Sequence, residues 1–89
     1  MEARKRYVDV IVRFRSDGRM LPAEILWQDG RRFHVDRILD ISPAPALRAG
    51  GQGDRYTVRI GSKVCYLFFE HACDMDGDRP GRWFVEAVQ

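Results

Sequence analysis

The chain has 89 residues and a formal net charge of +2, with 45% apolar and 31% charged residues. These values indicate one small globular domain, which buries about 60–65% of its unfolded surface and has little stability to spare. No apolar run approaches the ~20 residues of a membrane span, and M-E-A-R-K-R at the start leads into a strand rather than an apolar signal segment, so we expect a cytoplasmic protein of bacterial type.

The net charge is too small to indicate a nucleic-acid partner by itself, but the basic residues have two notable features. Residues 1–19 carry six basic and three acidic side chains. Thirteen of the 15 basic residues are arginine, whose planar guanidinium suits phosphate or carboxylate recognition and stacks on rings. A GC-rich genome would explain the arginine excess equally well.

The first predicted hairpin follows a basic lead-in, residues 1–6, that we expect to be frayed. Residues 7–15 alternate, with Val8, Val10, Val12 and Phe14 inward. Asp17-Gly18 predicts a two-residue turn, and the resulting register places apolar residues opposite one another: Phe14 with Leu21, Val12 with Ala23, Val10 with Ile25 and Val8 with Trp27. Pro22 lacks an N–H group, so we expect it at an edge, a bulge or a strand start.

The second predicted hairpin turns at Asp29-Gly30. A two-residue loop would mix polar and apolar side chains on both faces. A three-residue loop, residues 28–30 with Gly30 left-handed, keeps one face apolar, and we choose it. That face carries Leu21, Ala23, Ile25, Trp27, Phe33, Val35, Leu39 and Ile41, with Ile38 on the opposite face and Arg37 at the edge of the apolar one. The third strand is predicted to run to about Ile41.

The second half of the chain predicts three more strands. Residues 42–54 contain two prolines and three glycines, which predicts a long loop. Residues 55–60 form the fourth strand, Gly61-Ser62 a type II′ turn, and residues 64–70 a fifth strand that is apolar on both faces. This register pairs Val58 with Cys65, Tyr56 with Leu67, Arg59 with Val64, Thr57 with Tyr66 and Arg55 with Phe68. Residues 74–81 are predicted to be a loop and residues 82–88 the sixth strand.

Six strands, five turn signals and no helical period predict an all-β fold, a six-stranded antiparallel meander within a single domain of residues 1–89. Closure into a small barrel or roll would hide the sheet edges.

The principal candidate site is the outer face of the fourth and fifth strands. Arg55, Arg59, Tyr66 and Phe68 combine aromatic rings with guanidinium groups, a mixture that binds single-stranded nucleic acid in small β-domains. Arg13 and Arg15 would extend the basic surface if the first strand lies nearby. Two other interpretations stay open. Loop 42–54 or the C-terminal residues would cover Tyr66 and Phe68 as a second small core, or the face would bind a protein partner or a second copy of the chain.

Metal and catalytic chemistry are less well supported. His34, Cys65, His71 and Cys73 lack a zinc-like spacing, and on a continuous strand Cys65 and Cys73 would lie ~26 Å apart. D-M-D-G-D at residues 74–78 has its glycine at the fourth position rather than at the sixth position of a calcium loop. Glu24, His34 and Asp36 lack any recognisable nucleophile or phosphate motif. We therefore expect no metal, no cofactor and no enzymatic activity.

The motifs W-Q-D-G-R-R-F-H-V-D-R-I-L-D, R-Y-T-V-R-I, Y-L-F-F-E and R-W-F-V-E resemble a family of small, uncharacterised bacterial β-rich domains with the pattern W-x-x-G-R-x-F/Y-x-V. The resemblance covers roughly residues 25–88. Some such domains are encoded near, or attached to, error-prone DNA polymerases. The matching positions are mostly core positions, so the resemblance implies a fold and an association with nucleic-acid work, and no site residues.

Overall fold

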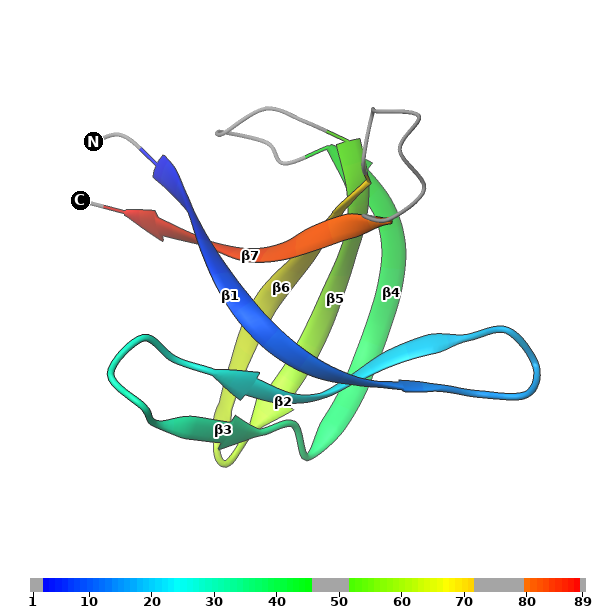
Figure 1. Ribbon diagram of the computed structural model, residues 1–89, viewed down its shortest axis with the longest axis horizontal. Coiled ribbons are helices and arrows are strands. Elements are labelled where there is room, and N and C mark those ends of the chain that lie inside the picture. Colours follow the sequence, from blue (N-terminus) through cyan, green and yellow to red (C-terminus); the bar gives the residue numbers. More distant parts are fainter. Residues whose placement is uncertain (1–2, 46–51, 72–79, 89) are drawn as a thin grey trace.

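The computed structural model describes residues 3–45, 52–71 and 80–88 (Figure 1). Within them, seven strands form one antiparallel sheet in the order β3-β2-β1-β7-β6-β5-β4. The strands are β1 (Ala3–Phe14), β2 (Met20–Leu26), β3 (Arg32–His34), β4 (Arg37–Pro45), β5 (Gln52–Ile60), β6 (Lys63–His71) and β7 (Gly81–Val88). The all-β antiparallel prediction is confirmed, with one strand more than expected. No helix in these three ranges could cross a membrane.

The sheet curls into a half-barrel (Figure 1). Its two edge strands, β3 and β4, follow one another in the chain and are joined by a short link. The Val35 N–H donates to the Ala23 carbonyl and the Asp36 N–H to the Arg59 carbonyl, both at 2.9 Å. The Tyr56 hydroxyl donates to the Met20 carbonyl at 2.9 Å, connecting β5 to β2. Three hydrogen bonds therefore tie the two ends of the sheet together, as a barrel-like roll requires.

The first hairpin differs from its prediction at the turn. Arg15 and Arg19 flank a three-residue loop that ends in Gly18 at φ 92°. Phe14 therefore pairs with Met20, one residue from the predicted register. A bulge beside Pro22 restores the register, so that Val10 pairs with Ile25 as predicted. Proline fits there because its missing N–H costs no ladder hydrogen bond at a bulge.

The N-terminal lead-in was also predicted wrongly. Ala3 to Arg6 belong to β1 and pair with Val88 to Val85 of β7. The basic composition of this segment indicated fraying, but pairing with β7 supplies the missing partner for its backbone groups.

The second hairpin follows the three-residue prediction. Trp27 and Arg31 flank the loop, Gly30 has φ 90°, and Ile25 pairs with Phe33. The prediction of one strand to Ile41 is wrong, because the chain leaves β2 after His34 and crosses to β5 as β4. The link changes which side chains point inward. Ile38 packs against the core, while Leu39, in a bulge, and Ile41 are exposed.

Strand β4 continues through residues predicted to be loop. Pro43 pairs with Asp54, and Pro45 pairs with Gln52. Because β4 is the last strand of the sheet, its prolines need no partner on the open side, which is where proline is tolerated. Of the predicted loop 42–54, residues 42–45 belong to β4 and residues 52–54 to β5, and residues 46–51 lie outside the described part of the chain.

The β5–β6 hairpin matches its prediction at every predicted pair, from Arg59 with Val64 to Arg55 with Phe68. Gly61 has φ 62° and no non-glycine residue of the described ranges has positive φ, which is the type II′ arrangement. The last predicted strand is β7, which lies between β1 and β6.

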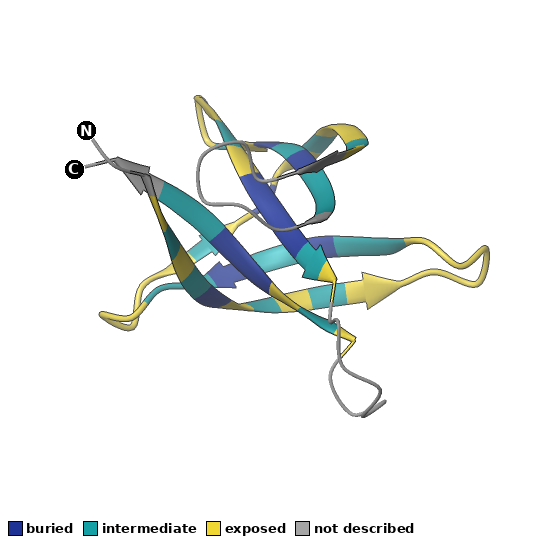
Figure 2. Cartoon of the chain, turned by 90° about the horizontal axis from the view of Figure 1, so that it is seen from above, coloured by how far each residue is buried: buried dark blue, intermediate teal, exposed yellow. Residues whose placement is uncertain are grey.

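The main core fills the concave side of the half-barrel. Its largest aromatic group centres on Trp83, whose ring lies 5.0 Å from Tyr56 and 4.9 Å from Phe69. Val58 and Leu67 are completely buried beside this group. Buried positions concentrate in the middle of the strands, and the hairpin tips are exposed (Figure 2).

Candidate nucleic-acid interface

The candidate face is the convex side of the β5–β6 hairpin. Tyr56, Val58 and Leu67 point into the core, so their sequence neighbours point outward. The type II′ turn sets the register that places Tyr66 opposite Thr57 and Val64 opposite Arg59. The predicted geometry of this hairpin is therefore confirmed, and the exposure of each side chain decides which ones a ligand can reach.

Tyr66 is available to a ligand. Its residue is 54% exposed, and the Arg55 guanidinium carbon lies 5.0 Å from the ring centroid. The Arg55 Nε is buried without a hydrogen-bond partner in the described structure. Arg55 therefore lies beside the Tyr66 ring, and its Nε–H is a buried donor without an acceptor.

Phe68 is not available, which corrects its assignment to the site. It is only 9% exposed and forms a second, smaller core with Phe84 and Tyr7. Its ring stacks on Phe84 at 5.1 Å and 10°, and Tyr7 meets Phe84 edge-on at 5.8 Å. The alternative interpretation, a second core covered by C-terminal residues, is confirmed for Phe68 and wrong for Tyr66.

Arg13 and Arg15 do not join the face. They lie at the far end of the β1–β2 hairpin, which projects from the half-barrel (Figure 1). Among the described strands, β1 pairs only with β2 and β7. The Arg15 Nε lies 3.7 Å from an Asp17 oxygen within the hairpin tip. The expectation that these arginines extend the basic surface depended on a neighbouring first strand, and β7 separates β1 from β6.

Arg37 does join the face, although its sequence position placed it at the edge of the apolar side. It pairs directly with Arg59 across β4 and β5, so the two side chains lie on the same face. Val64, 59% exposed, is on the other side of Arg59. We define the aromatic–arginine face as Arg37, Arg55, Arg59, Val64 and Tyr66. Arg37 is identified as part of this face only by the pairing of β4 with β5, and no local sequence pattern predicts that pairing.

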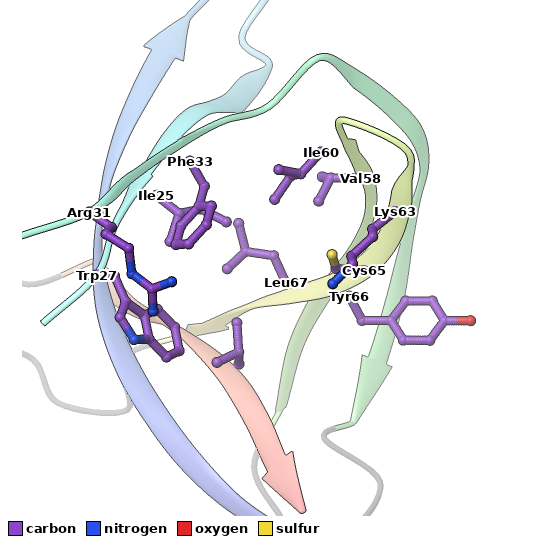
Figure 3. Close-up of a pocket in the computed structure, with 11 residues that line it drawn as sticks. Ile25, Trp27, Arg31, Phe33, Val58, Ile60, Lys63, Cys65, Tyr66 and Leu67 are labelled. Atoms are coloured by element: carbon purple, nitrogen blue, oxygen red, sulfur yellow. The ribbon is translucent and has the colours of Figure 1, made fainter. Parts of the chain in front are cut away.

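A second feature, the apolar slot, opens beside the face (Figure 3). It is a hollow of about 290 Å³ between the β2–β3 hairpin and strands β5, β6 and β7. Its apolar walls include Ile25, Trp27, Phe33, Val58, Ile60, Cys65, Leu67 and Val85, and Arg31 and Lys63 supply its cations. Tyr66 also lines it, so the slot adjoins the aromatic–arginine face.

A polar cluster that the sequence did not indicate covers the second core. Glu70 accepts hydrogen bonds from the Lys5 ammonium and from the Tyr7 hydroxyl, the latter at 2.8 Å. The Arg82 guanidinium lies 3.8 Å from the centre of the Tyr7 ring. The Lys5 hydrogen bond is the main cause that lowers the pKa of Glu70, and burial is the main cause that raises the pKa of Tyr7. The charged and polar groups of this cluster have partners within it, which indicates a structural role.

The residues weighed for metal binding or catalysis are dispersed. No group of three or more histidine, cysteine, aspartate or glutamate side chains in the described ranges is arranged to hold a metal ion. Cys65 lines the apolar slot, His71 contacts Asp54 at 3.0 Å, and Cys73 and residues 74–78 lie outside the described residues. Glu24 pairs with His34, while Asp36 accepts a hydrogen bond from the Gly61 N–H at 2.6 Å and so fastens the β5–β6 turn.

No family model matches this chain, and neither the curated proteins nor the solved structures contain a match to it.

Proposed function

We propose that the protein is a non-enzymatic module that binds single-stranded nucleic acid weakly through the aromatic–arginine face. The observation that carries the proposal is the exposed Tyr66 ring with Arg55 beside it, on the same face as Arg37 and Arg59. An exposed ring accepts a base by stacking regardless of sequence, and the guanidinium groups meet the phosphates on either side.

The pairing of Arg37 with Arg59 supports this function. Two like charges directly opposite on a sheet repel each other and reduce stability unless an anion lies between them. No carboxylate of the described residues forms an ion pair with Arg37, Arg55 or Arg59. A phosphate would relieve the repulsion, and the exposed side chains of Arg37 and Arg59 would donate hydrogen bonds to it.

The test is fluorescence anisotropy of labelled single- and double-stranded oligonucleotides, titrated with the protein at several salt concentrations. Three phosphate contacts on a single strand give a log–log salt slope of about −2, so a fourfold rise in salt should weaken binding about 15- to 20-fold. Tyr66→Ala should weaken binding about 5- to 100-fold by loss of stacking, whereas Tyr66→Phe keeps the ring and should bind normally.

A charge-matched pair of variants separates the face from general electrostatic attraction. Arg37→Ala with Arg59→Ala removes two charges from the face, and Arg13→Ala with Arg15→Ala removes two from the projecting hairpin. The first pair should flatten the salt slope by about 1.4, and the second should leave it unchanged. Equal losses for both pairs, or undiminished binding by Tyr66→Ala, would refute the site.

A second candidate function is a protein–protein adaptor or a homodimer that uses the same face. Val64 and Tyr66 are large apolar neighbours that are both more than half exposed, as at many contact surfaces. Apolar pairing should persist at high salt, where phosphate binding fails. Sedimentation showing a monomer at all concentrations would exclude the homodimer.

A further inference from the structure

Strands β6 and β7 are paired at only one end. Their ladder runs from His71 with Gly81 to Phe68 with Phe84 and stops there. Beyond that point β6 continues beside β5 down to Lys63, while β7 continues beside β1 to Val88. The two strands diverge, and the apolar slot lies where they do so, lined by β6 from Lys63 to Leu67 and by Val85 of β7 (Figure 3).

The divergence leaves backbone hydrogen-bonding groups of β6 without a strand partner. The pair that flanks a two-residue turn, here Ile60 with Lys63, exchanges hydrogen bonds, and such pairs alternate along an antiparallel ladder. Cys65 and Leu67 therefore bond to β5. Val64 and Tyr66 direct their N–H and C=O groups away from β5, to the side on which β6 pairs with β7 farther along, and Tyr66 lines the slot. This is an open strand edge of the kind that accepts another strand.

The chemistry of the slot restricts its occupant. Aliphatic, aromatic and thiol groups make up most of its lining, and no carboxylate lines it. Lys63 forms no ion pair in the described part of the chain. Arg31 is held by Asp29 at 2.6 Å, with its guanidinium 5.4 Å from the Phe33 ring centre. An occupant thus needs apolar side chains facing inward and a negative charge near Lys63.

From these observations we propose that the slot receives an extended peptide of a partner protein. The peptide adds a strand to the free edge of β6 and bonds to Val64 and Tyr66. Every second side chain enters the hollow against Trp27, Leu67 and Val85, and an acidic residue of the peptide meets Lys63. Backbone hydrogen bonds supply the affinity, and alternate side chains supply the specificity.

The first test selects peptides from a phage-displayed library of random heptapeptides on the full chain and measures the best binder by fluorescence anisotropy. We expect selected peptides with alternating apolar residues and an acidic residue. Methylating each backbone nitrogen of the binder in turn should weaken binding at every second position only, since only alternate N–H groups face β6. No enriched peptide, or a scan without this alternation, would overturn the proposal.

Protein variants test the edge and the charge separately. Val64→Pro removes the free N–H without breaking the ladder to β5 and should weaken binding at least about fivefold, the effect of one net hydrogen bond. Val64→Ala keeps the N–H and should bind normally. Lys63→Glu should weaken binding of the acidic peptide, whereas Arg13→Glu changes the charge equally at the remote hairpin and should not. If Val64→Pro fails to fold, the Lys63 variant and the methylation scan still decide.

Two other occupants would show themselves in the same experiments. A concentration-dependent dimer that Val64→Pro converts to a monomer would mean that a second copy fills the slot. Tight binding of dodecanoate that Val64→Pro leaves intact, with no peptide selected, would mean that a small apolar anion fills it. Either result replaces the partner peptide.

Discussion

The hydroxyl of Tyr56 provides the sharpest test of barrel closure. Tyr56 is buried, and its hydroxyl donates to the Met20 carbonyl at 2.9 Å. Tyr56→Phe removes one neutral hydrogen bond and leaves the ring in place beside Trp83. The lost bond and the partly unsatisfied carbonyl together should lower the free energy of unfolding by about 1–2 kcal/mol. For a domain of this size that corresponds to a fall in Tm of about 5–15 °C.

Urea unfolding followed by tryptophan fluorescence measures this difference. Tyr66→Phe is the matched control, because it removes the same atom from an exposed ring and should change stability by less than about 0.5 kcal/mol. The m-value should be the same for all three proteins, since none changes the surface exposed on unfolding. Equal stabilities for the two variants would refute the argument that this hydrogen bond ties β5 to β2.

Four further substitutions probe other parts of the fold. Gly53→Ala should cost more than about 2 kcal/mol in urea unfolding because its Cβ would collide with the Phe69 carbonyl, whereas Gly18→Ala, in open space at positive φ, should cost about 1 kcal/mol. Phe84→Ala should cost about 3–5 kcal/mol by emptying the second core, and thermal unfolding monitored by circular dichroism would show it. The lowered pKa of Glu70 means that its carboxylate stabilises the fold above the ordinary pKa of glutamate and loses that effect as the pH falls through the folded-state value. Glu70→Gln should therefore show a flatter dependence of urea midpoint on acid pH than the unsubstituted protein.

Much of the strand arrangement was predictable from turn residues and alternation. Gly30 and Gly61 adopt the left-handed conformations expected of them, and the hairpins that they close have the predicted registers. Gly18 is also left-handed, yet its loop is one residue longer than predicted. The bulge beside Pro22 compensates for this difference. The alternation of apolar and polar residues predicts the strand register that core packing requires. The same alternation fits either a two-residue loop or a three-residue loop followed by a bulge.

The break after His34 was not predictable from the same signals. Val35 keeps its inward position, so the apolar pattern of residues 33–41 looks continuous until the chain changes partner. The change depends on where β5 lies, which is a property of the folded sheet. Arg37 was misplaced for this reason.

The exposure of Tyr66 and the burial of Phe68 likewise depend on residues that are distant in the sequence. Both side chains occupy the same face of β6, as alternation predicted. Phe68 is buried because Phe84 and Tyr7, from β7 and β1, cover it, and neither reaches Tyr66. A sequence pattern predicts which face of a strand a side chain occupies. Only the tertiary arrangement shows which residues cover that face.

One structural cause underlies both proposed surfaces. β1 is long enough to pair with β7 through its first half and with β2 through its second. Because β7 stays paired with β1, it separates from β6 beyond Phe84. On the convex side, this departure ends the aromatic cover at Phe68 and exposes the Tyr66 ring. At the edge, it frees the backbone groups of Val64 and Tyr66 beside the apolar slot. An added peptide strand on β6 would lie directly beside the ring proposed to stack on a base, so occupation of one surface should alter access to the other.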